Sequence, residues 1–157
     1  MKYSSEIESS PKSFAVGDFN NDNWLDIAVA HYNPYNLALL IGYGNGTFEK
    51  ISQYLNEDES GLLWVIAGDF NNDKQIDIAC VNYPTSDVVI LLGNGNGTFI
   101  NGTLYSTGKG IFARSIIVGD FNNGNQLDIA TANYGTNSIG VLFGYENGTF
   151  AAVTTYA

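Results

Sequence analysis

A loop rich in aspartate and asparagine carries the most informative chemistry of this sequence. Residues 18–26 place oxygen-bearing side chains at loop positions 1, 3, 5 and 9, namely Asp18, Asn20, Asp22 and Asp26. A tight turn can bring alternate side chains to one point, and Ca²⁺ takes about six to eight oxygen ligands from carboxylates, amides and carbonyls. Trp24, at position 7, would contribute only its backbone carbonyl. We therefore predict a calcium site in this loop.

The same loop occurs twice more, at steps of 51 residues. The second copy offers Asp69, Asn71, Asp73 and Asp77, with the carbonyl of Gln75. The third copy offers Asp120, Asn122 and Asp128, with the carbonyl of Gln126. Gly124 stands where the other two loops have their third acid. The third site is therefore expected to bind calcium more weakly.

Turn formation alone offers another explanation for these loops. Asp and Asn favour turns because their side chains hydrogen-bond to nearby backbone groups. That chemistry explains one polar loop, but it does not explain three acids gathered without a basic neighbour in the first loop. Two carboxylates about 4 Å apart repel by roughly 4 kcal/mol at an effective dielectric of about 20. Such a cluster favours a bound cation.

The loops belong to a repeat that occupies the whole chain. The step of 51 residues also links Gly42, Gly93 and Gly144, and Phe48, Phe99 and Phe150. In the second repeat, the runs 64–68, 77–81, 88–92 and 98–104 predict four short strands. The pairs Asn45-Gly46, Asn96-Gly97 and Asn147-Gly148 predict type I′ hairpin turns, which need positive φ at both central residues.

A period near 50 residues with four strands per unit is typical of a β-propeller blade. We predict an all-β fold of three tandem four-stranded antiparallel blades, at approximately 4–54, 55–105 and 106–156, in one repeat domain covering 1–157. A solenoid of β-hairpins is the alternative, although its periods are usually shorter.

Composition argues against several classes of function. The 157 residues hold 6 Lys+Arg against 16 Asp+Glu, for a net charge of −10. So acidic a chain is not expected to bind nucleic acid or anionic lipid, which need clustered cations. One cysteine and one histidine leave no disulfide framework and little room for a histidine-based metal site. Apolar runs such as 88–92 are too short to insert across a bilayer.

The motifs resemble the FG-GAP repeats, and the closely related VCBS-type repeats, over essentially the whole chain. Gly17-Asp18-Phe19-Asn20, the loop, and Asp26-Ile27-Ala28-Val29 follow the family pattern closely. The resemblance implies calcium held in loops on one face of a β-propeller, as in the heads of integrin α-subunits. It also implies a binding or adhesion module that is not an enzyme. The family usually has glycine at loop position 6, where this chain has Asn23, Lys74 and Asn125.

Ring closure requires more than three blades, since propellers usually have about four to eight. Three blades alone would expose two apolar blade faces. We therefore expect a homodimer, in which two chains join head to tail as a six-bladed ring, with further blades of a longer chain as the alternative. Such a module is expected outside the cell or at its surface, although residues 1–11 show no signal peptide.

Two other functions stay open at this point. Tyr32, Tyr83 and Tyr134 follow the second strand of each repeat, and sugar-binding propellers stack aromatic rings on pyranose faces. A lectin-like module with a glycan ligand is therefore an alternative to one with a protein ligand. An ancillary domain of a larger enzyme is the other. Cys80, inside a strand, is expected to be buried and inert, and the six repeated phenylalanines are expected in the core: Phe19, Phe48, Phe70, Phe99, Phe121 and Phe150.

Overall fold

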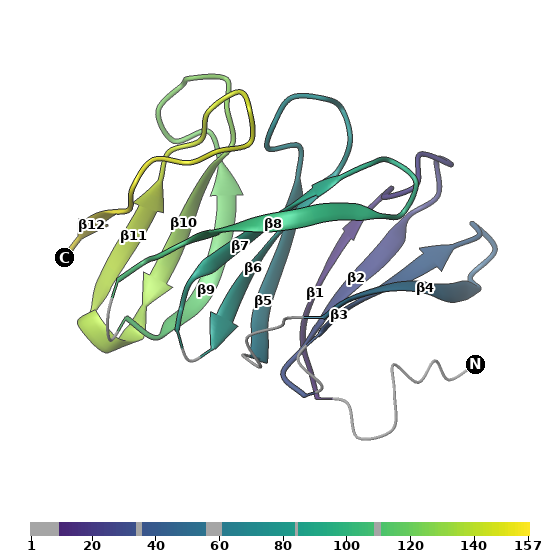
Figure 1. Ribbon diagram of the computed structural model, residues 1–157, viewed down its shortest axis with the longest axis horizontal. Helices are drawn as coiled ribbons and strands as arrows, with labels where there is room; N and C mark the ends of the chain where they lie inside the picture. The colour runs from purple at the N-terminus through teal and green to yellow at the C-terminus, as the bar shows by residue number, and fades with distance from the viewer. Residues whose placement is uncertain (1–9, 34–35, 56–60, 84, 109–110) are drawn as a thin grey trace.

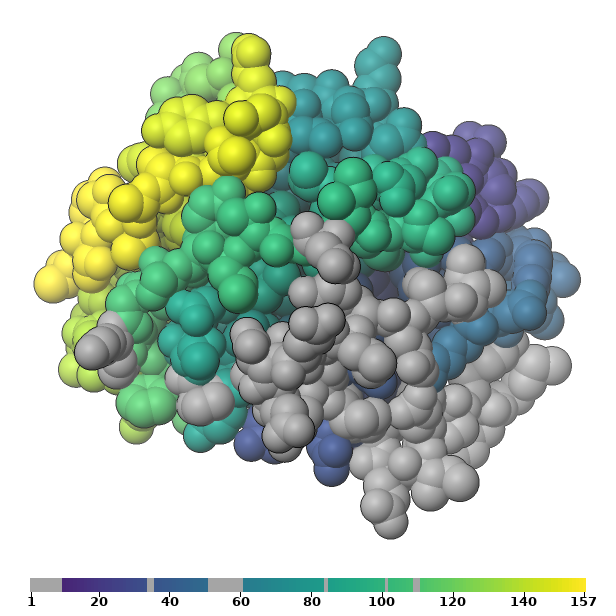
Figure 2. Space-filling view, in the orientation of Figure 1, coloured from purple at the N-terminus to yellow at the C-terminus, as the bar shows by residue number. Residues whose placement is uncertain are grey.

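The computed structural model describes residues 10–33, 36–55, 61–83, 85–108 and 111–157. It contains three four-stranded antiparallel sheets, each with its strands in chain order, standing side by side (Figure 1). The prediction of an all-β fold with three tandem blades is thus confirmed. In the space-filling view, blade 1 lies at the right and blade 3 at the left, with described atoms of blade 2 between them (Figure 2).

The strands of each blade follow the repeat. Blade 1 contains β1 (Pro11–Gly17), β2 (Asp26–His31), β3 (Asn36–Gly42) and β4 (Phe48–Leu55). Blade 2 contains β5 (Gly61–Gly68), β6 (Asp77–Tyr83), β7 (Val88–Gly93) and β8 (Phe99–Tyr105). Blade 3 contains β9 (Ala113–Gly119), β10 (Asp128–Asn133), the 3₁₀ turn η1 (Tyr134–Thr136), β11 (Ser138–Leu142) and β12 (Thr154–Tyr156). No helix in these described ranges is long and apolar enough to cross a membrane.

The predicted strand boundaries differ from the observed ones mainly at strand ends. β5 begins at Gly61, three residues before the predicted start, because a register shift between Leu62 and Trp64 lets the pairing with β6 continue. β6 runs on through Asn82 to Tyr83. The last strand, β12, has only three residues. The predicted start of blade 1, at residue 4, lies outside the described residues.

The hairpin turns are not type I′, so that prediction was wrong. Gly97 has a φ of 79°, as such a turn needs, but Asn96 is not in the left-handed region. Instead, its side-chain Oδ1 accepts hydrogen bonds from the amide of Thr98 (3.1 Å) and from its hydroxyl (2.6 Å). The pairs at 45–46 and 147–148 use the same side-chain bonds. The asparagine acts through its side chain rather than its backbone.

The core lies between adjacent blades rather than within one sheet. One cluster joins blades 1 and 2 and includes Leu39 and Ile78; the next joins blades 2 and 3 and includes Ile90 and Ile129. The first strands of the blades, β1, β5 and β9, contact one another in that order. Cys80 is buried in the first cluster, and this burial raises the pKa of its thiol to about 12. The prediction that Cys80 is buried is therefore confirmed.

Candidate metal-binding loops

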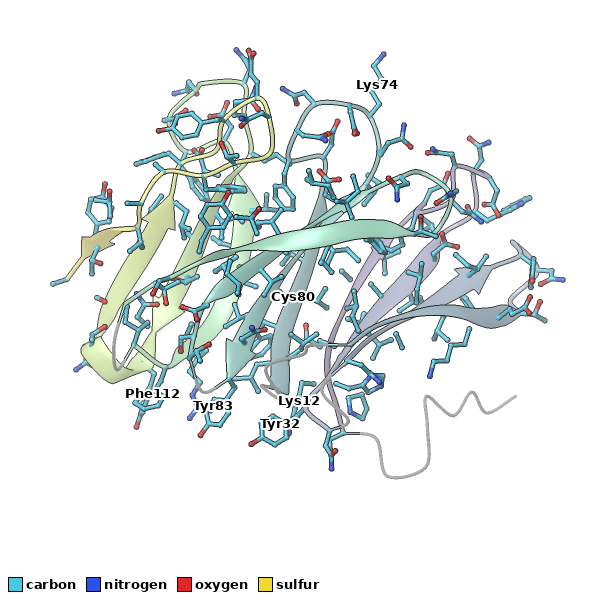
Figure 3. All side chains as sticks on the ribbon, viewed as in Figure 1. Lys12, Tyr32, Lys74, Cys80, Tyr83 and Phe112 are labelled. Atoms are coloured by element: carbon cyan, nitrogen blue, oxygen red, sulfur yellow. The ribbon has the colours of Figure 1, made fainter. Side chains whose placement is uncertain are left out.

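The three predicted loops lie at the same edge of the molecule. Each follows the first strand of its blade, and these strands run in the same direction, so all three loops emerge along the upper edge of Figure 1. Lys74, in the second loop, marks this edge in the stick view (Figure 3). The repeat thus brings all the predicted ligand positions to one face.

In the first loop, side-chain oxygens accept hydrogen bonds from the loop backbone. Asp18 accepts the amide of Asp22 at Oδ1 (3.1 Å) and the amide of Asn23 at Oδ2 (2.8 Å). Asp22 Oδ1 accepts the amide of Trp24 (2.8 Å). Asn20 donates from Nδ2 to Asp22 Oδ2 (2.8 Å). The side chains at positions 1, 3 and 5 therefore turn toward the inside of one tight loop.

The residue at position 6 of each loop has a left-handed backbone conformation. At position 6, φ is 68° for Asn23, 69° for Lys74 and 58° for Asn125. This is the conformation that favours glycine, the residue usual at this position in the FG-GAP repeats that the loops resemble, and asparagine tolerates it well. Lysine adopts it at a cost, so the second loop holds its shape against some backbone strain.

The aspartate at position 9 anchors each loop to its blade. Asp26 is fully buried, and its two carboxylate oxygens accept the amides of Phe19 (2.9 Å) and Gly42 (2.8 Å). Asp77 and Asp128 make the same pair of bonds in the other blades. Burial raises the pKa of Asp26, and the nearby carboxylates of the loop add to that effect. A bound cation would offset both causes.

The second loop reproduces the first closely. Asp69 accepts the amides of Asp73 and Lys74 at 3.1 Å and 2.9 Å, Asp73 accepts the amide of Gln75 (2.7 Å), and Asn71 donates to Asp73 (2.9 Å).

The third loop keeps only part of this network. Asp120 accepts the amides of Gly124 (3.0 Å) and Asn125 (2.9 Å), and Asn122 accepts that of Gly124 (2.7 Å). Position 5 of this loop is Gly124, so it has no carboxylate there.

The repeat geometry agrees with a comparison against protein-family models. The model of the FG-GAP-like repeat matches residues 18–80 and 69–131, two overlapping stretches that together cover most of the chain. The chain belongs to the FG-GAP-like repeat family. No curated protein matches it.

The donor chemistry of these FG-GAP-like loops fits calcium in kind. Within the described ranges, no three acidic, histidine or cysteine side chains are grouped so that they could hold a metal ion. The carboxylates point at backbone amides instead, which is the turn chemistry considered above. However, an ionised carboxylate has about four lone-pair sites, so an oxygen that accepts one N–H can still bind a cation. Loops one and two have the mixed oxygen set that calcium prefers, and loop three lacks one acid.

A contact between neighbouring loops was not foreseen from the sequence. Asn21 donates from Nδ2 to the side-chain oxygen of Gln75 and to the carbonyl of Gly95 (3.2 Å), so loop one of the FG-GAP-like array is tied to blade 2. Gln75 was predicted to act through its backbone carbonyl, and the structure shows its side chain in use. The corresponding Gln126 Oε1 is buried and has no hydrogen-bond partner among the described residues.

The sequence analysis also missed two cations at the opposite edge. Lys12 and Arg114 stand 102 residues apart, twice the repeat, with Leu63 midway. Both lie beside the tyrosines that follow the second strands of FG-GAP-like blades 1 and 3. The shared repeat position was the signal that could have revealed them.

Proposed function

We propose that this chain is a calcium-stabilised set of propeller blades that acts as a recognition or adhesion module and completes its ring with a second copy. The observation that carries the calcium proposal is the loop geometry. Three loops share the left-handed turn at position 6, the inward-turned side chains at positions 1 and 3 and the buried aspartate at position 9. When bound, calcium would neutralise the carboxylates, and its binding free energy would stabilise the fold.

The charge balance supports the same proposal. The loops contain eight of the 16 acidic residues, all within segments that hold only one lysine. Three calcium ions would offset six of the ten net negative charges. Asp18, Asn20, Asp22 and Asp26 would hold the first ion, together with the carbonyl of Trp24, and the second loop offers the corresponding set.

The proposal of a second copy rests on how the two end blades differ from the middle one. Phe14 on β1 is 71% exposed, whereas Val65 and Ile116, at the same position of the repeat, are 4% and 6% exposed. Val65 and Ile116 lie on the faces with which blades 2 and 3 pack against the preceding blade. The matching face of blade 1 is apolar and uncovered by the described residues.

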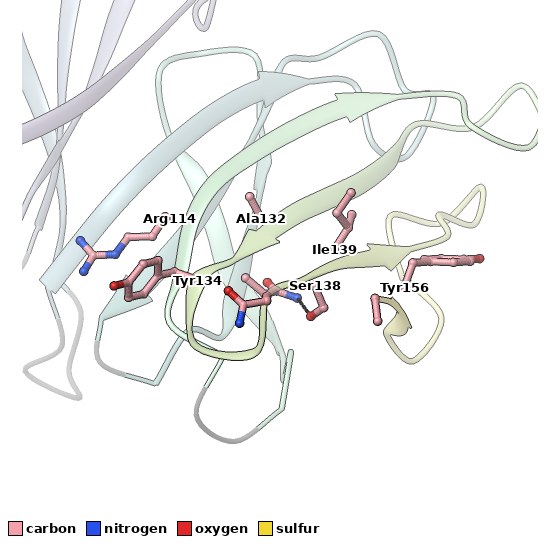
Figure 4. A pocket seen from close by; sticks show the side chains of 9 residues that line it. Arg114, Ala132, Tyr134, Ser138, Ile139 and Tyr156 are labelled. Carbon is pink, nitrogen blue, oxygen red and sulfur yellow. Dashed lines mark hydrogen bonds between the residues drawn. The ribbon is translucent and has the colours of Figure 1, made fainter.

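The far face of blade 3 supports the same proposal from the other end of the chain. Ile139 on β11 is 53% exposed, whereas its repeat equivalents Leu37 and Val88 are fully buried against the following blade. Ile139 pairs with Ala132 across the sheet, and a hollow of about 470 Å³ lies beside them on this face (Figure 4). This face of blade 3 is equivalent to the faces of blades 1 and 2 against which blades 2 and 3 pack.

The two end faces therefore correspond to the two sides of the blade-to-blade contacts within the chain, which supports a contact between two copies. A second copy could seat its Phe14 face on the Ile139 face of the first, and the reverse contact would close a two-fold ring of six blades. Such closure would bury both apolar faces without leaving an open end.

Calorimetric titration of chelator-treated protein tests the calcium part. We expect calcium binding, with a melting temperature that rises in calcium and falls in excess chelator. Asp22→Asn should lower the affinity of the first loop by roughly tenfold, since ligand charge sets the affinity of such sites. Glu146→Gln, which removes one exposed charge outside the loops, is the matched control and should bind like the unmodified chain. A melting temperature indifferent to calcium in every variant would contradict the proposal.

Light scattering tests the second copy. We expect a mass of twice 17.0 kDa, about 34 kDa, for the unmodified chain. Phe14→Asp should give the single-chain mass with little change in melting temperature at low concentration, because this side chain is exposed in the single chain. Leu104→Asp, an equally apolar exposed position on β8, is the control and should leave the mass unchanged. A 17.0 kDa species for the unmodified chain in calcium would overturn this part.

A further inference from the structure

Aromatic and cationic side chains from all three blades gather at the edge opposite the acidic loops. Two sets of residues share repeat positions. Lys12, Leu63 and Arg114 lie near the beginning of the first strands, and Tyr32, Tyr83 and Tyr134 lie at or just after the end of the second strands. Five of these line a cavity of about 170 Å³, namely Lys12, Tyr32, Leu63, Tyr83 and Arg114. In Figure 3, Lys12, Tyr32 and Tyr83 lie at the lower edge, and Lys74 lies at the upper one.

The cavity concentrates positive charge in an acidic protein. The chain has only six Lys and Arg residues, and two of them line this one cavity. Among the residues that the structure describes, neither Lys12 nor Arg114 forms an ion pair with a carboxylate. No carboxylate of the described residues therefore competes with an anionic ligand for their N–H donors. A carboxylate suits them, because guanidinium binds it through two parallel hydrogen bonds.

The tyrosines hold these cations and offer ring surface. Lys12 Nζ lies 5.6 Å from the centroid of the Tyr32 ring, and Arg114 Cζ lies 5.4 Å from that of Tyr134. These cation–π distances favour the observed positions of both side chains. The rings of Tyr32 and Tyr83 pack at 5.7 Å with an angle of 55°, forming a tilted aromatic wall.

A rigid aromatic wall and two cations together select a ligand with a flat apolar face and a negative charge. Aromatic rings pack well against C–H surfaces, while the tyrosine hydroxyl supplies a polar contact at the rim. Pockets for drug-sized ligands measure roughly 300–1,000 Å³, so a cavity of this smaller size suits a single ring. A bare inorganic anion would leave the aromatic wall unused.

We propose that this cavity binds an acidic sugar residue, a pyranose ring that carries a carboxylate. Lys12 and Arg114 bind the carboxylate, and Tyr32 and Tyr83 contact the ring. This inference rests on the proposed recognition role and names its ligand class. The site lies on the face opposite the calcium loops, so each of the two sites can be tested without the other.

The test is an NMR titration of the intact chain with D-glucuronate, with D-glucose and acetate as the neutral sugar and the bare carboxylate. We expect glucuronate to shift the amide signals of the five lining residues, at about tenfold lower concentration than either control compound. Arg114→Gln and Lys12→Gln should each weaken glucuronate binding by about tenfold, the effect of losing one charged contact. Lys74→Gln, which removes a cation at the opposite edge, should bind like the unmodified chain.

Three outcomes would overturn the inference: no shifts with glucuronate, equal shifts with glucose or acetate, or the same loss in Lys74→Gln. Each titration is run with calcium and with chelator, and the melting temperature is recorded for each variant. If glucuronate binds but the melting temperature does not depend on calcium, the cavity assignment holds and the calcium proposal fails. Calcium-dependent melting without glucuronate binding would overturn only the cavity assignment.

Discussion

The ring of Phe19 packs edge-on against the ring of Phe99, with centroids 5.9 Å apart, and so joins the first loop to the last strand of the next blade. Phe70 and Phe150 repeat this contact at 5.8 Å. Phe121 occupies the same position in blade 3, yet its side chain is 46% exposed. Its predicted place in the core was wrong, because no described blade follows blade 3 to cover it.

This difference predicts opposite effects for two identical substitutions. Phe70→Ala removes a fully buried ring and should lower the free energy of unfolding by about 3–5 kcal/mol. Phe121→Ala should cost less than about 1 kcal/mol in the single chain, as exposed positions usually do. Urea denaturation at low protein concentration measures both. In the proposed ring, Phe121 would meet Phe48 of the second copy, so its substitution should also weaken association. Equal losses of stability for both variants would contradict this interpretation.

The close approach of a strand to each loop predicts a sensitive glycine. A Cβ on Gly93 would overlap the backbone carbonyl oxygen of Ile76, and the amide of Gly93 also donates to Asp77 Oδ1 (2.8 Å). Gly93→Ala should therefore displace the second loop and cost about 1–3 kcal/mol, measured by thermal or urea unfolding. Gly17→Ala is the control, since its Cβ would meet side-chain atoms rather than backbone, namely Ile76 Cγ2 at 3.1 Å and the Phe19 ring at 3.4 Å. The interpretation fails if Gly17→Ala is the more damaging change.

The buried aspartate of the second loop predicts a pH dependence of stability without calcium. Burial, with a smaller contribution from Asp73 and Asp69, raises the pKa of Asp77 from 3.8 to about 6 despite the amides of Gly93 and Phe70. The folded state then binds a proton more tightly than the unfolded state. The contribution of Asp77 to stability should therefore be fully present below about pH 4, be lost as the pH rises to about 6, and stay constant above it.

Urea denaturation at a series of pH values in chelator measures this slope. Asp77→Asn cannot titrate, so it should remove the part of the slope that Asp77 contributes. The remaining part would come from Asp26, whose pKa is raised for the same reason. The assignment is contradicted if the unmodified chain and Asp77→Asn show the same dependence of stability on pH across this range.

The repeat made the blades and their loops predictable from the sequence, whereas the type of the repeated hairpin turns was predicted wrongly. The spacing predicted the blades and the loops, because these are local properties that recur with each unit. The left-handed backbone at Asn23 and Lys74 followed from the resemblance, since the FG-GAP repeats usually have glycine at that position. The sequence could not show that Asp26 accepts the amide of Gly42, 16 residues away, because that contact depends on how β3 lies against the loop. Nor could it separate Phe121 from its repeat equivalents, since exposure depends on which blade stands next.

The third loop provides the strongest test of the calcium proposal, because one substitution can restore what it lacks. Gly124 does not have the left-handed backbone that would exclude other residues, so an aspartate fits its conformation. A new Cβ would lie 2.6 Å from Asn122 Oδ1, the end of a side chain that can move. In the first loop, the corresponding Asn20 Oδ1 lies 3.1 Å from the amide of Asp22, against 2.7 Å in the third loop. A small movement of Asn122 would therefore reproduce the geometry of the first loop.

Gly124→Asp should raise the calcium affinity of the third loop by about tenfold or more, because ligand charge tunes such sites. Calorimetric titration measures the affinity, and the melting temperature in calcium should rise with it. Gly124→Asn, of nearly the same size but neutral, is the matched control and should gain much less. If the loops form only turns, the added carboxylate will repel Asp120 and Asp128 in calcium as in chelator. Gly124→Asp would then melt below Gly124→Asn under both conditions, and the calcium proposal would fail.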